Sequence, residues 1–437
     1  MAGQDLNPLP RLAYVYHPLS FAPLSITDAA RGVCQLVWVV DCRDPETART
    51  ARLLRKFGPV VDSGGRTLEE TATLLGEHRP AGILSMHDSD LAWTADLAAL
   101  LELPFHSPDA ALKLTDKHAQ RQALSAAGLR VPAFTVIPGG ADLGAVAKLT
   151  GNFRYPAVLK PRFGQASRNT VPVSSPAAVL STLVEMVGDP QADSEDYVLE
   201  ELVPDARDAL GGHGFANFVS VESAVNGGEV QNLSISGRTP FRWPFRETGY
   251  FTPCPLSEQL TIEVCEVAAQ AARALGVTVG CLHTEIKLTD SGPVVIEVNG
   301  RPGGGMSEML ERASGFSILR AALRLAIGDS LNVHGLIPCS GVAYLLYTFP
   351  EAEGEFVLRV DGLSALREHE GVEEVVLVRG PGQRIDWREG SEAHVFHFAG
   401  HARDHDELRG LIRAAAELVQ IEVTDAAGYA LTGTSEP

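Results

Sequence analysis

The chain has 437 residues, of which 45% are hydrophobic and 21% are charged, and its formal net charge is −19. This length is enough for more than one hydrophobic core, at about 100–200 residues per domain. A chain this acidic repels phosphate backbones and anionic bilayers, so we expect neither nucleic acid nor a membrane as partner. The same charge also serves ordinary solubility.

The six cysteines form no C-x-x-C pair, and most lie in apolar runs. We expect buried free thiols of a reducing compartment, and neither a disulfide framework nor a zinc site. The first residues lack the basic-then-apolar order of a signal peptide, and no apolar run approaches the roughly 20 residues of a membrane helix. The sequence therefore predicts a cytoplasmic protein.

Short apolar runs at 12–16, 33–41 and 82–85 alternate with helical patterns such as ARTARLLRKF. Strands that alternate with helices predict a parallel α/β sheet, and this first unit should end near Pro108. A helix is expected over 116–127, because Gly128 and then Pro132 close it.

The middle of the chain predicts extended runs, two hairpins and further helices. The runs PAVLKPRFG, VPVSS and YVLEELV read as strands, with a helix after the second that Ser175 should cap. Hairpins are expected over 217–235, turning at 226–228, and over 281–299. Helices are expected at 260–275, 307–313 and 317–327, followed from Pro338 by a small α+β tail of strands and one helix.

The hairpin over 281–299 is the most informative segment. If residues 290–292 form its loop, Thr289 pairs with Pro293, Glu285 lies opposite Glu297, and His283 lies opposite Asn299. Alternate residues share a face, so these two glutamates, His283 and Asn299 project together. The opposite face should bury an apolar stripe that consists of Leu282, Ile286, Val294, Ile296 and Val298.

Two directly opposed carboxylates repel each other unless something compensates them. Mg²⁺ takes oxygen ligands, and Asn299 adds one. Arg301 offers a fork of donors for phosphate or carboxylate, and the glycines at 303–305 should leave backbone amides free near an anion. A solvated hairpin face is the plainer interpretation of the glutamates, but the added Asn299, Arg301 and glycines favour a metal–phosphate site.

Two lysines and one loop could hold phosphates. Lys160 ends an apolar run, and Lys117 begins a helix, where the helix dipole disfavours a cation. The polar loop at 164–170, which contains Ser167, could fold over phosphates. The run from Val198 to Val203 could present backbone groups to adenine, although an edge strand with solvated glutamates would also explain it.

In this order, the pieces resemble the ATP-grasp superfamily across roughly the whole chain, most strongly from Thr115 to Gly305. The resemblance implies an α/β and α+β ATP-grasp fold: an N-terminal α/β domain at 1–107, a lid subdomain at 108–195, a large subdomain at 196–335 and a small α+β domain at 336–437. It implies that Lys117, Lys160 and Ser167 contact ATP phosphates, and that Glu200, Glu201, Leu202 and Val203 form the adenine hinge. It also implies Glu285, Glu297 and Asn299 as Mg²⁺ ligands, for two ions that Mn²⁺ could replace, and Arg301 as the catalytic residue.

Three further motifs, F-V-S-V-E-S from Phe218, E-T-G-Y from Glu247 and H-T-E-I-K-L from His283, look like those of L-amino-acid ligases. That resemblance implies a dipeptide-forming ligase that works through an acyl phosphate. Glu247, Tyr250, His283 and Arg301 would contact small-molecule substrates, and a homodimer is the usual assembly. Tyr250 departs from the histidine common in such enzymes and is a poor base near neutral pH. Such enzymes commonly carry an acidic residue for the ribose just before S-V-E. No such residue is evident here, since the position reads Phe218.

Two other interpretations stay open. Another ATP-grasp enzyme is one, either a bicarbonate-dependent carboxylase or a ligase of an acid that is not an amino acid. A non-catalytic nucleotide-binding regulator is the other, and the presence of both lysines, both glutamates and Arg301 disfavours it.

Overall fold

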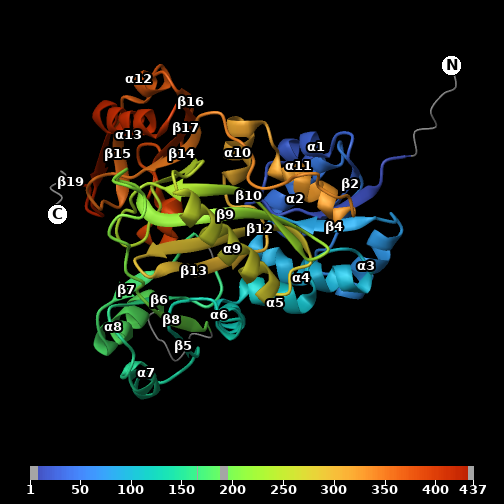
Figure 1. Ribbon diagram of the computed structural model, residues 1–437, viewed down its shortest axis with the longest axis horizontal. Coiled ribbons are helices and arrows are strands. Elements are labelled where there is room, and N and C mark those ends of the chain that lie inside the picture. The colour runs from blue at the N-terminus through green and yellow to red at the C-terminus, as the bar shows by residue number, and fades with distance from the viewer. Residues whose placement is uncertain (1–7, 165, 188–194, 432–437) are drawn as a thin grey trace.

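The computed structural model describes residues 8–164, 166–187 and 195–431. Three regions follow one another in colour in Figure 1: an N-terminal sheet with its helices, a small green lobe, and a long central sheet that runs on into the C-terminal region. Within the described part of the chain, none of the helices has the length and apolar character needed to cross a bilayer.

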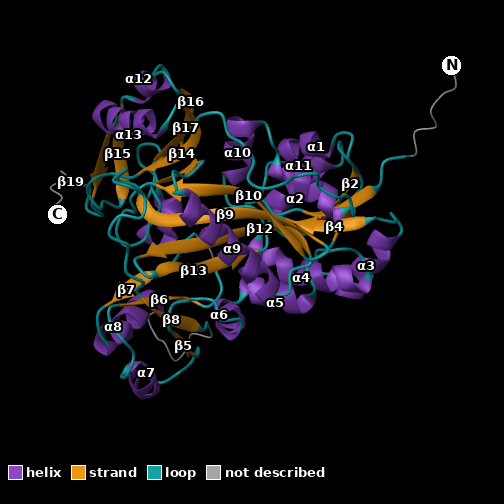
Figure 2. Cartoon of the chain, viewed as in Figure 1, coloured by secondary structure: helices purple, strands orange, loops and turns teal. Residues whose placement is uncertain are grey.

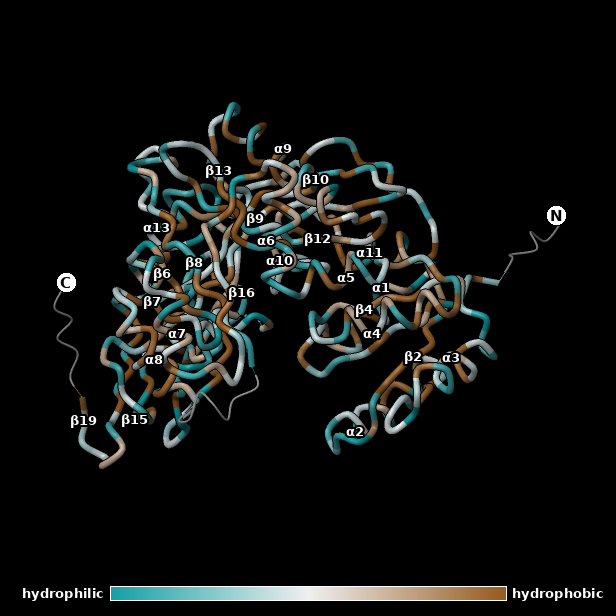
Figure 3. Tube along the Cα trace, turned by 90° about the horizontal axis from the view of Figure 1, so that it is seen from below, coloured by the Kyte–Doolittle hydropathy of each residue, from teal (hydrophilic) through white to brown (hydrophobic). Residues whose placement is uncertain are grey.

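The N-terminal region is a parallel sheet, as the sequence predicts, with four strands in the order β3-β2-β1-β4, of which β3 was not predicted. Its elements are β1 (Arg11–Val15), α1 (Pro23–Ala30), β2 (Gln35–Val40), α2 (Pro45–Leu54), β3 (Val60–Asp62), α3 (Leu68–Gly76), β4 (Gly82–Ser85) and α4 (Asp88–Leu100). In Figure 3 the trace is brown, and so hydrophobic, along β2 and β4. Trp38 and Leu12 are fully buried and share a core with Leu323 of helix α11 (Ile318–Ala326), so this sheet packs against the rest of the molecule.

The green lobe is a four-stranded antiparallel sheet in the order β5-β8-β6-β7. Its elements are β5 (Phe134–Ile137), α7 (Leu143–Thr150), β6 (Ala157–Pro161), β7 (Val171–Val173), α8 (Pro176–Val187) and β8 (Tyr197–Glu201). Ser175 caps α8 as predicted, because its Oγ accepts from Ala178 N at 3.2 Å. Strand β8 lies inside the sheet, which excludes the edge-strand interpretation of 198–203.

The central sheet has eight strands in the order β13-β12-β9-β10-β11-β14-β17-β16, and its long orange arrows dominate Figure 2. Its strands are β9 (Ala216–Asn226), β10 (Glu229–Arg238), β11 (Gly249–Thr252), β12 (Val279–Thr289), β13 (Gly292–Asn299), β14 (Val342–Thr348), β16 (Val372–Leu377) and β17 (Phe396–Ala402). Both predicted hairpins are present. The expected C-terminal tail is not wholly separate from the central sheet. Its strands β14, β16 and β17 belong to that sheet.

Helices α5 (Pro108–Thr115), α6 (Lys117–Ala126), α9 (Glu258–Ala274), α10 (Met306–Ser314) and α11 (Ile318–Ala326) surround the central strands. The C-terminal region adds β15 (Phe356–Asp361), α12 (Leu363–Arg367), the 3₁₀ segment η1 (Trp387–Ala393), α13 (His405–Leu418), β18 (Gln420–Thr424) and β19 (Ala430–Leu431). The sequence missed α5 and placed the other helices of this central group correctly. The domain boundaries at 107, 195 and 335 stay a prediction.

All six cysteines are free thiols, as predicted. Only Cys34 and Cys281 are buried, however, and the other four are partly exposed, so the prediction of uniformly buried thiols was wrong.

Candidate functional site

A cleft of about 1140 Å³ lies between the green lobe, the central sheet and the C-terminal region. Every residue predicted for the site lines it except Asn299. The lining residues that were predicted are Lys117, Lys160, Ser167, Glu200, Glu201, Leu202, Val203, Glu247, Tyr250, His283, Glu285, Glu297 and Arg301. Asn299 is buried and pairs with His283 in the hairpin, next to this group.

The hairpin β12–β13 has the predicted pairing at its functional end. Glu285 lies opposite Glu297, and His283 lies opposite Asn299. The predicted pairing of Thr289 with Pro293 was wrong, because Thr289 pairs with Gly292 and the turn is one residue shorter.

A bulge restores the register, since Glu285 pairs with Glu297 while Ile286 pairs with Val295. The extra residue is Ile296. It lines the cleft, and Val295 takes its expected place in the core. The bulge therefore aims an apolar side chain and a carboxylate, Ile296 and Glu297, at the same cavity.

The two opposed carboxylates have cations of the protein beside them. Glu297 Oε1 lies 3.2 Å from Lys117 Nζ, and Glu285 Oε1 lies 3.4 Å from His283 Nε2. The other ring nitrogen of His283 contacts Glu222 on β9. Burial alone would lower the pKa of His283, but the Glu222 carboxylate raises it to about 9, so the ring is charged at neutral pH. The repulsion is thus compensated within the chain.

The same residues suit a hard divalent cation. Two carboxylates and one amide oxygen, from Glu285, Glu297 and Asn299, come from adjacent strands and share one end of the hairpin. The charged neighbours hold the pKa of Glu285 below its usual range despite its burial, so this ligand is ionised. An oxygen donor set of this kind is the one that Mg²⁺ takes together with substrate phosphates.

Lys117 is buried, with 7% of its surface exposed. Asp116 caps helix α6 by accepting from His118 N at 2.9 Å and pairs with Arg162 at 2.5 Å. Lys117 Nζ donates to Gly164 O at 2.6 Å. This lysine therefore joins helix α6 to the hairpin and to the start of the polar loop.

Lys160 and Glu200 form the second buried charge pair. Lys160 Nζ lies 2.7 Å from Glu200 Oε2, on neighbouring strands β6 and β8. Arg121 of α6, fully buried, places Nε 2.9 Å from Glu200 Oε1. Burial lowers the pKa of Lys160, and Glu200 opposes that shift. The Glu200 side chain thus holds two cations, a role the sequence did not predict, and Arg121 was missed.

The segment after β8 lines one end of the cleft with Leu202, Val203 and Asp205. Asp205 was missed. Its carboxylate pairs with Lys287 Nζ at 2.6 Å, and both residues line the cavity beside the predicted hinge. An aspartate therefore lies beside Lys287, which pairs with Phe218 across β12 and β9.

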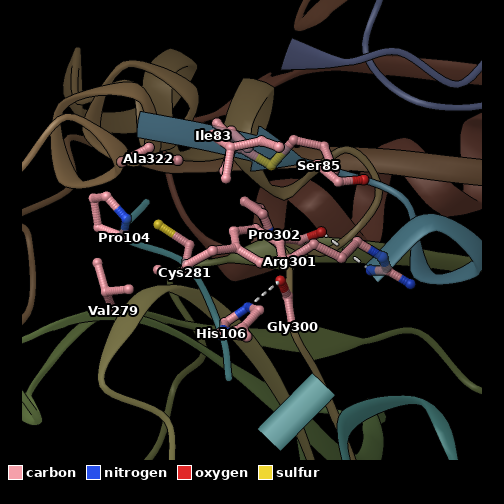
Figure 4. Close-up of a pocket in the computed structure, with 15 residues that line it drawn as sticks. Ile83, Ser85, Pro104, His106, Val279, Cys281, Gly300, Arg301, Pro302 and Ala322 are labelled. Atoms are coloured by element: carbon pink, nitrogen blue, oxygen red, sulfur yellow. Dashed lines mark hydrogen bonds between the residues drawn. The ribbon is translucent and has the colours of Figure 1, made fainter. Parts of the chain in front are cut away.

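Arg301 follows β13 and turns toward the N-terminal region. Its Nη2 atom lies 2.5 Å from Oδ2 of Asp88, the first residue of α4. Figure 4 shows a second, small pocket that Arg301 also lines, where His106 Nε2 contacts the Gly300 carbonyl at 3.1 Å. The expectation of free glycine amides fails in part, because Gly303 N donates to Glu222 at 3.1 Å.

Another charge pair involves Glu247, which was expected to contact a substrate. Arg238 Nε donates to Glu247 Oε1 at 2.8 Å, and Tyr250 OH donates to Oε2 at 2.5 Å. Arg238 is buried, lies 4.3 Å above the Tyr250 ring and was missed. Burial and the Glu247 charge raise the pKa of Tyr250, so this hydroxyl keeps its proton.

Ser167 belongs to the predicted polar loop at 164–170, of which residue 165 lies outside the described part of the chain. Its neighbour Ala166 accepts from Ser391 N at 3.2 Å, so the loop touches the C-terminal region. The backbone φ angles of Ala166, Ser167 and Asn169 are positive, at 56°, 55° and 52°.

His17, His87 and Asp90 form another group of ligand-type side chains, at the ends of β1 and β4. The two rings stack at 3.5 Å with an angle of 5°. His17 Nδ1 accepts from Leu19 N at 3.1 Å, so the neutral ring carries its proton on Nε2. Stacked planes and a protonated nitrogen do not direct lone pairs at a shared ion.

Comparison with known proteins finds a family model that matches part of the chain. The model of the ATP-grasp domain matches residues 153–309. The uncharacterized protein y4rH of Sinorhizobium fredii is 29% identical over 309 residues, 70% of this chain and 60% of that protein. Carnosine synthase 1 of Mus musculus is 27% identical over 290 residues, 60% of this chain and 33% of that enzyme. The chain thus spans a third to three fifths of the length of these relatives.

The crystal structure of an L-amino acid ligase from Bacillus licheniformis has a TM-score of 0.73 at 20% identity, covering 96% of this chain and 100% of that one. A biotin carboxylase domain from Hydrogenobacter thermophilus also matches, at a TM-score of 0.64 and 15% identity over 95% of this chain and 91% of that one. Likeness at these identities shows the fold and leaves the reaction open. The chain therefore contains an ATP-grasp domain and has the ATP-grasp fold of these ligases and carboxylases.

Proposed function

We propose that this protein is an ATP-dependent carboxylate–amine ligase that joins two amino acids, or an amino acid and a related acid, through an acyl phosphate. The observation that carries the proposal is the meeting in one cleft of two lysine–carboxylate pairs, an oxygen donor set for a cation, and the Arg238–Glu247 pair. Phosphates, metal and an amino-acid substrate would each find their counterpart there.

The nucleotide would take the end of the cleft lined by Lys160 and the segment after β8. Lys117 and Lys160 would hold phosphates, and the backbone of Glu201 and Val203 would read adenine. Glu285, Glu297 and Asn299 would hold Mg²⁺, which when bound neutralises charge on phosphate oxygens. Asp205 is our candidate for the ribose.

In the first step, a carboxylate oxygen of the acid attacks the γ-phosphorus of ATP, and the bond to ADP breaks. In the second, a neutral amine attacks the acyl carbon, the bond to phosphate breaks, and the amide forms. The departing phosphate takes one proton from the nitrogen, and solvent takes the other that the ammonium group lost earlier. Positioning and charge neutralisation supply the rate, so no nucleophilic side chain is needed.

Tyr250 takes no proton in this scheme. Its hydroxyl donates to Glu247, and burial raises its pKa. Glu247 accepts from Arg238 and Tyr250 together, so we assign it to binding and orientation. Arg301, steadied by Asp88, would stabilise the transferring phosphoryl group or the acid carboxylate.

The test is phosphate release with Mg²⁺-ATP against single amino acids, pairs of amino acids, and bicarbonate. We expect full release only with two amino acids, together with a product whose mass equals their sum less one water. Release with bicarbonate alone would move the protein to the carboxylases. Tight ATP binding without release on any of these panels would refute the dipeptide proposal.

A further inference from the structure

A tight turn with two aromatic side chains lies between strands β10 and β11, on the wall of the cleft. Arg242 N donates to Arg246 O at 2.9 Å, and Arg246 N donates to Arg242 O at 2.8 Å, so the backbone closes around residues 243–245, hereafter the aromatic turn. Trp243 and Phe245 both line the cleft, and their ring centroids lie 5.8 Å apart. The turn therefore presents two neighbouring rings to the cavity.

The wall around the aromatic turn is rich in exposed aromatic surface. Trp243 is 66% exposed, although an indole ring is among the side chains that gain most from burial. Phe241 and Phe218 of β9 also line the cleft, with ring centroids 5.4 Å apart. Pockets for small molecules are lined mostly by apolar and aromatic side chains, with a few polar groups among them. These four rings give one wall of the cleft that composition.

The backbone of Phe245 is strained. Its φ is 108°, in the region that favours glycine and that is an outlier for a bulky residue. Glycine would adopt this conformation at a lower cost in free energy, yet the position carries a ring that lines the cleft. Strained residues cluster at binding and active sites, where the surrounding structure holds them in place. The conformation therefore indicates that the Phe245 ring serves the cavity.

The back of the aromatic turn is anchored to the C-terminal region. Arg246 is buried, and its Nη1 donates to Trp243 O and to Glu353 Oε1 at 2.9 Å each. The guanidinium groups of Arg246 and Arg242 lie 4.4 Å and 5.3 Å from the ring centroid of Trp387. The turn is thus held in place before any ligand binds, which lowers the cost of ordering it on binding.

The aromatic turn belongs to the same short segment as the Arg238–Glu247 pair. Arg238 is the last residue of β10, and its Nε donates to Glu247 Oε1 at 2.8 Å. The hydroxyl oxygens of Thr239 and Thr248 lie 2.6 Å apart and join the two ends of the segment. One loop therefore carries both the carboxylate expected to contact a substrate and the two exposed rings.

The charges near the aromatic turn favour an uncharged ligand group. An aromatic face attracts cations as well as apolar groups. Arg242 and Arg246 flank the turn, however, and Arg242 Nη2 donates to a carbonyl, that of Glu351, so its charge has no carboxylate at this contact. Neither arginine lines the cleft, since both lie over Trp387. Their positive charge disfavours a lysine or arginine side chain at the rings, and their donors face away from an acidic one.

We propose that Trp243 and Phe245 form the side-chain subsite for the amino acid that contacts Glu247, and that this substrate carries a large apolar side chain. The proposal rests on the ligase function proposed above and names one of its two substrates by class. Binding would remove apolar surface of both the rings and the substrate from water. The two residues touch no reacting atom, so they determine specificity and take no part in the chemical steps.

Five variants of the full-length chain test the subsite. Trp243→Ala removes one ring, and Trp243→Phe keeps an aromatic surface at the same position. Phe245→Ala and Phe245→Gly both remove the other ring, but only glycine also relieves the backbone. Tyr429→Ala is the matched control, because Tyr429 is an aromatic residue that is 73% exposed and lies outside the cleft.

The first readout is the ratio of kcat/KM for phenylalanine to kcat/KM for alanine, each with the same second amino acid. The wild type should favour phenylalanine. Loss of either ring should lower the ratio by about tenfold, the effect of leaving a large apolar group partly in water. Trp243→Phe should retain most of the ratio, and Tyr429→Ala should match the wild type. Phe245→Gly should unfold at a higher temperature than Phe245→Ala while both lose selectivity alike.

A binding measurement separates this proposal from the ligase function. Calorimetry with phenylalanine, alanine and lysine in the presence of Mg²⁺-ADP needs no amide formation. Phenylalanine should bind most tightly to the wild type, and its advantage should shrink in Trp243→Ala. That result would support the subsite even if the wild type formed no amide, an outcome that would refute the ligase function alone.

Several results would overturn the subsite. Equal or undetectable affinity of the wild type for the three amino acids is one, and a preference for lysine is another. Unchanged selectivity in Trp243→Ala would also overturn it. So would a change confined to ADP affinity or to the oligomeric state of that variant, because the ring would then contact the nucleotide or a second copy of the chain.

Discussion

The buried pairing of Glu200 with Lys160 and Arg121 predicts a large loss of stability for Glu200→Gln. The variant keeps the shape of the side chain and removes its charge. The contacts of 2.7 and 2.9 Å correspond to about 6 kcal/mol each by Coulomb's law at an effective dielectric constant of 20. Desolvation offsets much of this, and breaking a buried pair typically costs about 3–5 kcal/mol. We expect a loss within that range.

The assay is urea unfolding followed through the lobe that contains β6 and β8, for example by exchange of its amides. Glu201→Gln is the matched control, because Glu201 is the next residue on β8 and is partly exposed. It should change the free energy of unfolding by less than about 1 kcal/mol. Equal unfolding of the two variants would refute the inferred burial of the Glu200 charge.

Nucleotide affinity gives the same variant a second signature. Burial lowers the pKa of Lys160, while the Glu200 carboxylate raises it. Removing the carboxylate therefore lowers that pKa further. Lysine is neutral above its pKa, so ATP affinity of Glu200→Gln should fall as pH rises through a range in which wild-type affinity is flat. Calorimetry at several pH values measures the ATP affinity of both proteins. Parallel profiles of affinity against pH would contradict the assignment of Lys160 to a phosphate.

Three further predictions concern single side chains. Glu297→Gln should lower kcat by about 10²–10³-fold with the fold kept, and a Mg²⁺ titration with unchanged turnover would exclude Glu297 as a ligand. Tyr250→Phe should keep turnover within about tenfold of the wild type and leave the shape of the pH–rate profile unchanged, because the raised pKa of Tyr250 prevents this residue from acting as the base. Loss of one limb of the pH–rate profile in the variant would contradict this. Arg162 lowers the pKa of Asp116 against the opposing effect of burial, so this pair contributes stability above about pH 4 that is lost as pH falls through the folded pKa. Asp116→Asn should flatten acid unfolding followed by circular dichroism, and an unchanged acid transition would refute the pair.

The prediction of the hairpin rested on the alternation of polar and apolar residues along its two strands. The alternation in 281–299 placed Glu285 opposite Glu297 without any structural knowledge. The bulge could not be predicted, because Val295, Ile296 and Val294 are all apolar β-formers and the sequence does not show which of them leaves the ladder. The predicted register was wrong by one residue at the turn, and the extra residue of the bulge brings it back to the predicted register at Glu285.

The partners of the predicted charges were missed because they come from distant parts of the chain. Arg121 lies 79 residues from Glu200 and belongs to a helix that packs across two strands. Asp88 lies 213 residues from Arg301. Nothing local marks either of these residues, since a charged side chain in a helix is ordinary until its burial is known.

A usable signal existed for Arg238 and Glu222. Ser220 and Glu222 alternate along β9 with Val219 and Val221, and Ser236 and Arg238 alternate along β10 with Ile235 and Gly237. Polar residues at period two in a buried strand predict a polar face. Applied to this hairpin, that rule would have placed both charges on the face that meets the cleft.

Because both lysines already hold carboxylates, the proposed binding of a nucleotide at this site would be an exchange of partners. Lys117 contacts Glu297, and Lys160 contacts Glu200. A phosphate gains from each lysine only the difference between its own attraction and that of the carboxylate it replaces. A cation held by Glu285 and Glu297 removes that competition at Lys117, since it occupies the carboxylate and adds positive charge of its own. Metal and nucleotide should therefore bind cooperatively, and Glu297→Gln should weaken the effect of Mg²⁺ on ATP affinity more than it weakens ATP affinity measured without metal.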